Sequence, residues 1–136
     1  QENGLEELSN ESTYKARMHS EGCTVIRLEN EIETDLNIRV DTVRFTQALM
    51  SALTYPQKYK EKREIDFKVT LDTEKNFINF RITNSPLADE RFTSQEVCIR
   101  HEINRLLFEY FGGSYKVQTN PDGKPTILFT FPSGRN

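Results

Sequence analysis

The stretch that decides the fold is DTVRFTQALMSALTYPQKYK, residues 41–60. Asp41 suits a helix N-cap, because its carboxylate can accept hydrogen bonds from the free backbone N–H groups of the next turn. An apolar stripe at helical spacing follows and predicts a helix that packs on a core. Pro56 disfavours helical geometry in the residue before it, so the helix should kink or end near Tyr55. The stripe consists of Phe45, Ala48, Leu49, Ala52 and Leu53.

Two more helices are predicted on either side of this one. Residues 5–20 repeat small and apolar residues at loosely helical intervals, and Gly22 provides a stop. Residues 97–110 form the clearest amphipathic pattern in the chain, and Gly112 and Gly113 should end that helix in left-handed geometry. The apolar set of the later helix is Val97, Ile99, Ile103, Leu106, Leu107 and Tyr110.

Strict alternation of apolar and polar residues predicts the strands. The stretch at 72–76 resembles a hairpin turn, NPDGKP at 120–125 is dense in turn formers, and 83–94 is a loop with Pro86 and no glycine. The predicted order of one helix followed by two strands occurs three times along the chain. This order predicts a two-layer α/β sandwich, with a mixed, mostly antiparallel sheet of five to six strands and about three helices on one face. The strands are expected at 24–32, 37–40, 65–71, 78–82, 115–117 and 127–131.

Length and composition set the remaining bounds. The 136 residues predict one domain, with 1–22 as an N-terminal helix and lead-in and 23–136 as the sandwich core. A net charge of -3 offers no basic field for nucleic acid, and no apolar run reaches the roughly 20 residues of a membrane helix. Because the chain begins with Gln, we expect a cytoplasmic piece of a longer protein that could carry an upstream membrane anchor. Cys23 and Cys98 predict two reduced thiols, with a disulfide left open.

Three strings carry a family resemblance. DTVRFTQALMSAL, with Lys58 and Tyr59 after it, resembles the N-box helix of the C-terminal ATPase-type domain of sensor histidine kinases. FINFRITNSP at 77–86 resembles the strand that leads into that family's first glycine box. FEYFGGSYKVQTNPDGKPTILFTFP at 108–132 resembles its closing helix, GG turn and final hairpin. The resemblance implies the fold shared with DNA gyrase, a heat-shock chaperone family and mismatch-repair ATPases.

The N-box resemblance implies which residues would face a nucleotide. In the family, the second Asn of the box coordinates Mg²⁺ between the phosphates, and the matching residue here is Tyr55, whose phenol is a bulky and weak neutral ligand. The first Asn is matched by Ser51. Lys58 and Tyr59 resemble the family's phosphate-contacting Lys and its aromatic neighbour. We expect Tyr55 to fill the emptied pocket rather than to hold a ligand.

The glycine boxes depart further from the family. The first box reads Asp-x-Gly-x-Gly in the family and spans Thr83 to Leu87 here, so the carboxylate for adenine is missing and Leu87 adds bulk where no Cβ should be. The second box, which presents backbone amides to phosphate, is matched by residues 94–98, which contain no glycine and place Glu96 near a triphosphate. Only about eight residues remain for the family's mobile lid.

These departures predict a degenerate ATPase-like domain that acts as a scaffold, with no catalytic residue, no metal site and no cofactor unless ATP and Mg²⁺ still bind. The expected partners are upstream dimerisation or phosphoacceptor helices of the same protein and a receiver domain or response regulator. The fragment should be monomeric, within a homodimeric parent and without membrane contact of its own. The degenerate nucleotide site would comprise Ser51, Tyr55, Lys58, Tyr59, Thr83 and Asn84.

Two other interpretations stay open. In an active histidine kinase domain, Lys58, Tyr59 and Asn84 would hold phosphate and base, and a phosphorylated histidine would pass its phosphoryl group to a response regulator. A serine-kinase regulator of the anti-sigma type has the same fold. His101 begins HEINRLL, but position 105 is Arg, so the second histidine of a zinc HExxH motif is missing. We expect His101 to be a surface or helix-packing residue.

Overall fold

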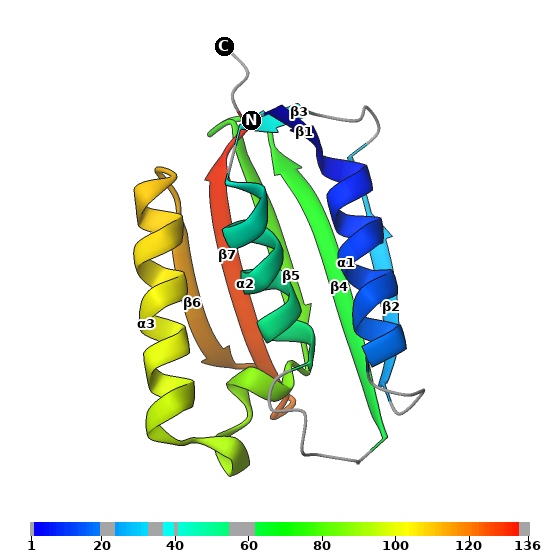
Figure 1. Ribbon diagram of the computed structural model, residues 1–136, viewed down its shortest axis with the longest axis vertical. Coiled ribbons are helices and arrows are strands. Elements are labelled where there is room, and N and C mark those ends of the chain that lie inside the picture. The colour runs from blue at the N-terminus through cyan, green and yellow to red at the C-terminus, as the bar shows by residue number, and fades with distance from the viewer. Residues whose placement is uncertain (1, 20–23, 33–36, 40, 55–61, 134–136) are drawn as a thin grey trace.

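The computed structural model describes residues 2–19, 24–32, 37–39, 41–54 and 62–133. Within these ranges, three helices lie on one face of a five-stranded sheet (Figure 1). The helices are α1 (Leu5–His19), α2 (Thr42–Thr54) and α3 (Gln95–Tyr110). The strands of the sheet are β2 (Thr24–Asn30), β4 (Arg63–Asp72), β5 (Phe77–Thr83), β6 (Ser114–Thr119) and β7 (Pro125–Pro132).

The sheet has the order β2-β4-β5-β7-β6. Strands β2 and β4 are parallel and the other neighbours are antiparallel, which confirms the mixed, mostly antiparallel sandwich. The expected short strand near residue 37 forms as β3 (Asn37–Arg39), but it pairs with β1 (Glu2–Gly4) outside the main sheet. The sequence did not predict β1, since three residues are too few to show alternation.

Local signals account for the helix ends. Asp41 caps α2 as predicted, because its Oδ1 accepts a hydrogen bond from the backbone N–H of Arg44 at 3.2 Å. The predicted kink at Tyr55 and Pro56 lies outside the described residues. Gly112 ends α3 in left-handed geometry, with φ of 88°. Gly113 is needed for a different reason than predicted: a Cβ there would lie 1.7 Å from the carbonyl oxygen of Thr130.

Aromatic packing between the helices and the sheet forms the core. Phe80 of β5 lies at its centre, with ring centroids 5.1 Å from Phe129 and 5.6 Å from Phe45 of α2. Phe108 of α3 stacks on Phe129 with centroids 4.6 Å apart. Each aromatic pair adds about 0.5–1.5 kcal/mol to the free energy that burial alone supplies. These contacts hold α2 against β5 and α3 against the neighbouring strand β7.

The core-facing side of α3 differs from the prediction. Val97, Asn104 and Phe108 are its buried residues, whereas most of the predicted apolar set is exposed. The prediction was wrong because apolar residues occupy two opposite sides of this helix, and spacing alone favoured the longer row. The exposed members are Ile99, Ile103, Leu106 and Tyr110.

Candidate functional site

Residues 83–92 begin at the last residue of β5 and occupy the positions matched to the first glycine box and the start of the lid; we call them the box segment. Asn84 leaves the strand with φ of 68°, a left-handed conformation that Asn tolerates better than most residues. Two 3-10 turns follow within the predicted loop, Pro86–Ala88 and Glu90–Phe92. The side chain of Asp89 caps the second turn by accepting a hydrogen bond from the backbone N–H of Arg91. The box segment is therefore ordered by its own local hydrogen bonds.

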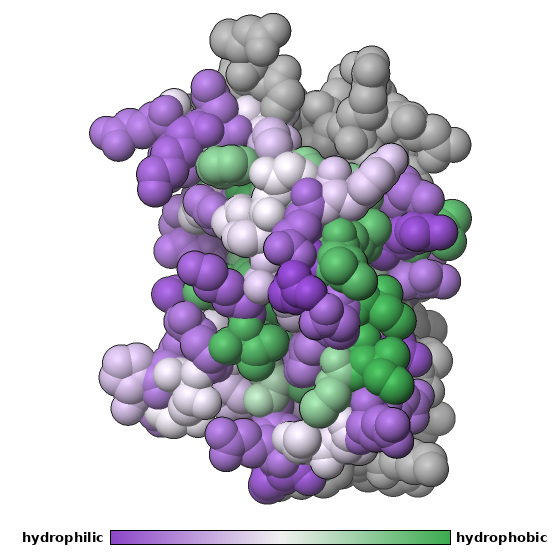
Figure 2. Space-filling view, turned by 90° about the vertical axis from the view of Figure 1, so that its left-hand side faces the viewer, coloured by the Kyte–Doolittle hydropathy of each residue, from purple (hydrophilic) through white to green (hydrophobic). Residues whose placement is uncertain are grey.

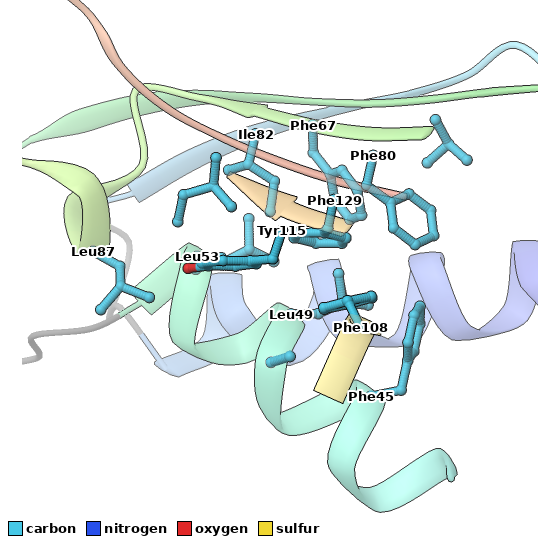
Figure 3. Packing of buried hydrophobic residues seen from close by; sticks show 14 of the residues in the cluster. Phe45, Leu49, Leu53, Phe67, Phe80, Ile82, Leu87, Phe108, Tyr115 and Phe129 are labelled. Carbon is cyan, nitrogen blue, oxygen red and sulfur yellow. The ribbon is translucent and has the colours of Figure 1, made fainter. Parts of the chain in front are cut away.

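The positions matched to the two box glycines are built into the core. The fully buried hydroxyl of Ser85 donates to the carbonyl of Ala52 in α2 at 2.6 Å, and its backbone N–H donates to Pro125 at 3.0 Å. Leu87 is fully buried, and Figure 3 shows its side chain pointing from the segment toward the rest of the cluster. The segment thus contributes core volume at a position where the family's glycines let the backbone approach a base.

A buried ion pair holds the other end of the segment. Arg63 at the start of β4 contacts Asp89 at 2.6 Å, with side-chain exposures of 7% and 12%. Burial raises the pKa of Asp89, but hydrogen bonds from Arg91 and Arg63 outweigh it and hold that pKa well below its usual range. Arg63 also donates to the carbonyl oxygen of Asn84 at 3.0 Å and to its side-chain oxygen at 3.2 Å.

Asn84 has its remaining side-chain group engaged as well, because its Nδ2 donates to the carbonyl of Glu64 at 2.9 Å. These bonds leave one N–H and one lone pair of the amide unused, but they fix its orientation. Turning the amide toward a base would break them, at about 0.5–1.5 kcal/mol each and about twice that where the partner is charged.

His101 of α3 fastens the middle of the box segment. Its Nε2 lies 3.1 Å from the carbonyl oxygen of Leu87, and its Nδ1 lies 2.7 Å from the hydroxyl of Tyr115 in β6. Because a carbonyl only accepts, Nε2 must carry the proton and Nδ1 must accept from Tyr115. Burial lowers the pKa of His101, partly offset by the bond to Leu87, and burial raises the pKa of Tyr115 to about 12. His101 therefore packs α3 against the box segment and β6, which confirms the prediction of a helix-packing residue.

Ser51, matched to the first Asn of the N-box, lies on the side of α2 that faces α3. Its hydroxyl donates to the carbonyl of Gln47 at 2.9 Å and accepts from Arg100 of α3 at 3.2 Å. It lines a groove of about 840 Å³ between α2 and α3, together with Arg44 and Arg100. At the matched second glycine box, Ser94 caps α3 by accepting from the N–H of Val97 at 3.1 Å.

The structure places the predicted site residues on two hollows, although the chain neighbours of Asn84 and Ser51, Ser85 and Ala52, are hydrogen-bonded at 2.6 Å. Asn84 lines a hollow of about 570 Å³ near Arg63 and Asp89, whereas Ser51 lines the groove between the helices. Thr83 is the last residue of β5 and pairs with Asp66 of β4 and Thr126 of β7. By the alternation of β5, it belongs to the face of the sheet opposite the buried Phe80 and Ile82. The predictions for Tyr55, Lys58 and Tyr59 lie outside the described residues.

No local pattern pointed to the pairing of Arg63 with Asp89. The two residues are 26 positions apart, and each lies among other charged residues. The sequence shows that Leu87 stands where the family has a glycine, but it does not show that this side chain is buried.

Two kinds of feature are absent from the described part of the chain. It contains no group of three or more His, Cys, Asp or Glu that could hold a metal ion. None of its helices is long and apolar enough to cross a membrane. The one cysteine it includes, Cys98, is an exposed free thiol.

Comparisons with known proteins bear on the fold. Neither protein-family models nor curated proteins match the chain. The catalytic domain of histidine kinase ThkA in a nucleotide-free form is similar, with TM-score 0.73 and 16% identity over 98% of this chain and 96% of that one. A histidine kinase from Burkholderia phymatum STM815 has TM-score 0.72 and 14% identity over 98% and 71%. The cytoplasmic segment of histidine kinase QseC has TM-score 0.70 and 13% identity over 98% and 78%. The chain therefore has the fold of histidine kinase catalytic domains.

Proposed function

We propose that this domain is a degenerate relative of histidine kinase catalytic domains that binds ATP and Mg²⁺ weakly or not at all and acts as a signalling scaffold. The observation that carries the proposal is the full burial of Leu87, where the family resemblance calls for a glycine against the base. Burying a leucine side chain contributes roughly 1.5–3 kcal/mol to folding. The box segment therefore serves stability where the family would need open backbone.

Two further features of the box segment support the same proposal. Both polar groups of the Asn84 side chain are engaged within the chain, and Thr83 supplies no carboxylate for an adenine amino group. In a scaffold, the sandwich would sit beside upstream dimerisation helices in a cytoplasmic, homodimeric parent, and a receiver domain would be a second partner. Such a role needs only the fold and an outer surface, not turnover.

Calorimetric titration with MgATP tests the proposal. We expect no saturable heat with nucleotide up to millimolar concentration, and no rise in melting temperature, since a ligand at 100 times its Kd would stabilise the fold by about 2.7 kcal/mol. The matched variant Thr83→Asp restores only the missing carboxylate and should also fail to bind, because Leu87 and Asn84 still fill the site. Micromolar binding by the unaltered chain would overturn the proposal.

One observation favours the alternative of an active kinase domain. Arg100 places a guanidinium against Ser51, in the groove that begins at the matched N-box position, and a cation there could meet phosphate. If this is the nucleotide site, MgATP binds to the unaltered chain and Arg100→Ala weakens it at least tenfold. Arg44→Ala, which removes a cation from the same groove but not the one bonded to Ser51, is the matched control.

A further inference from the structure

The outer face of α3 carries an apolar row that we call the outer stripe: Ile99, Ile103, Leu106 and Tyr110. These side chains are 51%, 58%, 55% and 86% exposed. Their spacing of four, three and four residues places them on one side of the helix, opposite the buried Val97, Asn104 and Phe108. In Figure 2, hydrophobic side chains gather in a band on the face of the molecule where α3 lies.

The outer stripe borders the groove between α2 and α3, which includes Ile103, Leu106 and Tyr110 in its lining. On the α2 side, Ala48 and Ser51 have small side chains that leave the groove open. A long hollow with one apolar wall, formed between two helices, matches the way proteins receive an amphipathic helix.

Charges distinguish the two edges of the stripe. Arg44 and Arg100 lie on the groove side, and their ion pairs to Asp41 (3.6 Å) and Glu96 (3.9 Å) are long and exposed. Exposed pairs contribute about 0–1 kcal/mol, so Arg44 can exchange its partner at little cost, whereas Arg100 would add a partner to its hydrogen bond with Ser51. On the opposite edge, Arg105 bonds to Glu102 and Glu109, and these three charges largely satisfy one another. The groove itself is lined by two arginines and one aspartate, Asp41, so its lining is weakly basic in a chain whose net charge is -3.

A second copy of the chain fits this surface poorly. At roughly 200 Å² per large side chain, the stripe exposes roughly 500 Å², so a symmetric pair would bury roughly 1,000 Å², below the 1,200–2,000 Å² of stable interfaces. An antiparallel pairing would also set Arg44 and Arg100 beside the same arginines of the other copy. A parallel pairing avoids that repulsion but buries no more area.

We propose that the outer stripe and the adjoining groove receive one amphipathic helix of a partner protein, with an acidic edge that meets Arg44 and Arg100. The partner presents apolar side chains at i, i+3 or i+4, and i+7 against Ile103 and Leu106. This inference rests on the proposed scaffold role only in that a scaffold needs a partner surface, and it does not depend on how nucleotide behaves.

Two synthetic probes test the proposal by fluorescence anisotropy. Both are 18-residue helical peptides with leucine at the stripe-matching positions, and they differ only in carrying glutamate or lysine along the edges. The glutamate peptide should bind at least tenfold more tightly, although its charge has the same sign as that of the protein. Ile103→Lys should weaken its binding at least tenfold, and Arg44→Glu with Arg100→Glu should make the lysine peptide the better ligand.

The matched control is Val25→Lys on β2, which alters a side chain of similar exposure (51%) at the far edge of the sheet and should leave binding unchanged. Circular dichroism and melting temperature check that each variant folds. Equal binding of the two peptides, no binding of either, or an equal effect of Val25→Lys would each overturn the proposal.

Two parallel measurements separate this inference from its rivals. Sedimentation equilibrium that shows a dimer abolished by Ile103→Lys would identify a second copy as the occupant and overturn the proposal. MgATP binding that displaces the glutamate peptide would make the groove a nucleotide site and overturn both proposals. MgATP binding that leaves the glutamate peptide bound would overturn the scaffold proposal alone. If neither MgATP nor the glutamate peptide binds, only the helix proposal is overturned.

Discussion

The box segment and the outer stripe of α3 lie close together in the chain but place their large apolar side chains in opposite environments. In the box segment, where the family resemblance calls for open backbone, Leu87 is fully buried and Ser85 is bonded to α2. In the outer stripe, where helical spacing suggests packing, Ile103 and Leu106 stay more than half exposed.

This difference indicates which surface of the fold is available for binding. A two-layer sandwich can lose a ligand-binding opening without losing stability, because apolar side chains that fill the opening become buried and stabilise the fold. An exposed apolar row contributes nothing comparable to folding, and such patches on soluble proteins commonly mark interaction sites. The contrast therefore favours partner binding on the helix layer over ligand binding at the end of β5.

Truncation of Leu87 should have the largest effect. Leu87→Ala removes a fully buried side chain between the box segment and the core and should lower the free energy of unfolding by about 2–5 kcal/mol. Urea denaturation followed by circular dichroism measures the change. A loss below about 1 kcal/mol would mean that the segment is not part of the core, and the contrast would fail.

Removal of one partner of the buried ion pair should come next. Arg63→Met leaves Asp89 and the carbonyl of Asn84 without this donor, and should cost about 3 kcal/mol, the lower end of the range for buried pairs because Arg91 still contacts Asp89. Arg63→Met combined with Asp89→Leu should recover part of that loss. Additive effects in this double-mutant cycle, measured by the same denaturation, would contradict the coupling.

Acid should weaken the fastening at His101. Its folded-state pKa is lowered, so the unfolded chain binds more protons below pH of about 6.5, and the free energy of unfolding should fall as pH drops through that value toward the folded pKa. His101→Gln should flatten this part of the stability profile, whereas His19→Gln serves as the control. A profile left unchanged by His101→Gln would remove His101 as the cause.

Asp89 acts in a more acidic window. Because its pKa is also held low in the folded state, its contribution is present at neutral pH and is lost only as pH falls below the usual range of an aspartate. Measurements between pH 7 and 5 therefore report on His101 with little interference from Asp89.

Changes in the outer stripe should have the smallest effect on stability. Leu106→Ala alters a side chain that is 55% exposed and should change the free energy of unfolding by less than about 0.5 kcal/mol. The same substitution chemistry at Leu87 is the matched comparison. A loss near 2 kcal/mol at Leu106 would show that the stripe serves the fold rather than a partner.

Much of the fold could be predicted because its signals are local. Asp41 shows its capping role in the residues next to it, and the alternation around Phe67 and Phe80 marks strands without reference to the rest of the chain. The candidate site could be predicted only in part, since Leu87 and Thr83 differ visibly from the family's box. The ion pair of Arg63 with Asp89 joins distant residues, so no local pattern could reveal it.

Local patterns in the sequence were enough to predict the helices, the strands of the main sheet, the layer architecture and the missing box glycines and carboxylate, because periodicity, capping and residue chemistry act within a few positions. Only the tertiary structure decided which side of α3 is buried, since both sides of that helix are apolar and the choice depends on how Phe108 meets Phe129 across the layer. It likewise decided that Leu87 fills the core and that Asn84 is engaged by Arg63, because contacts between distant residues depend on how the elements pack.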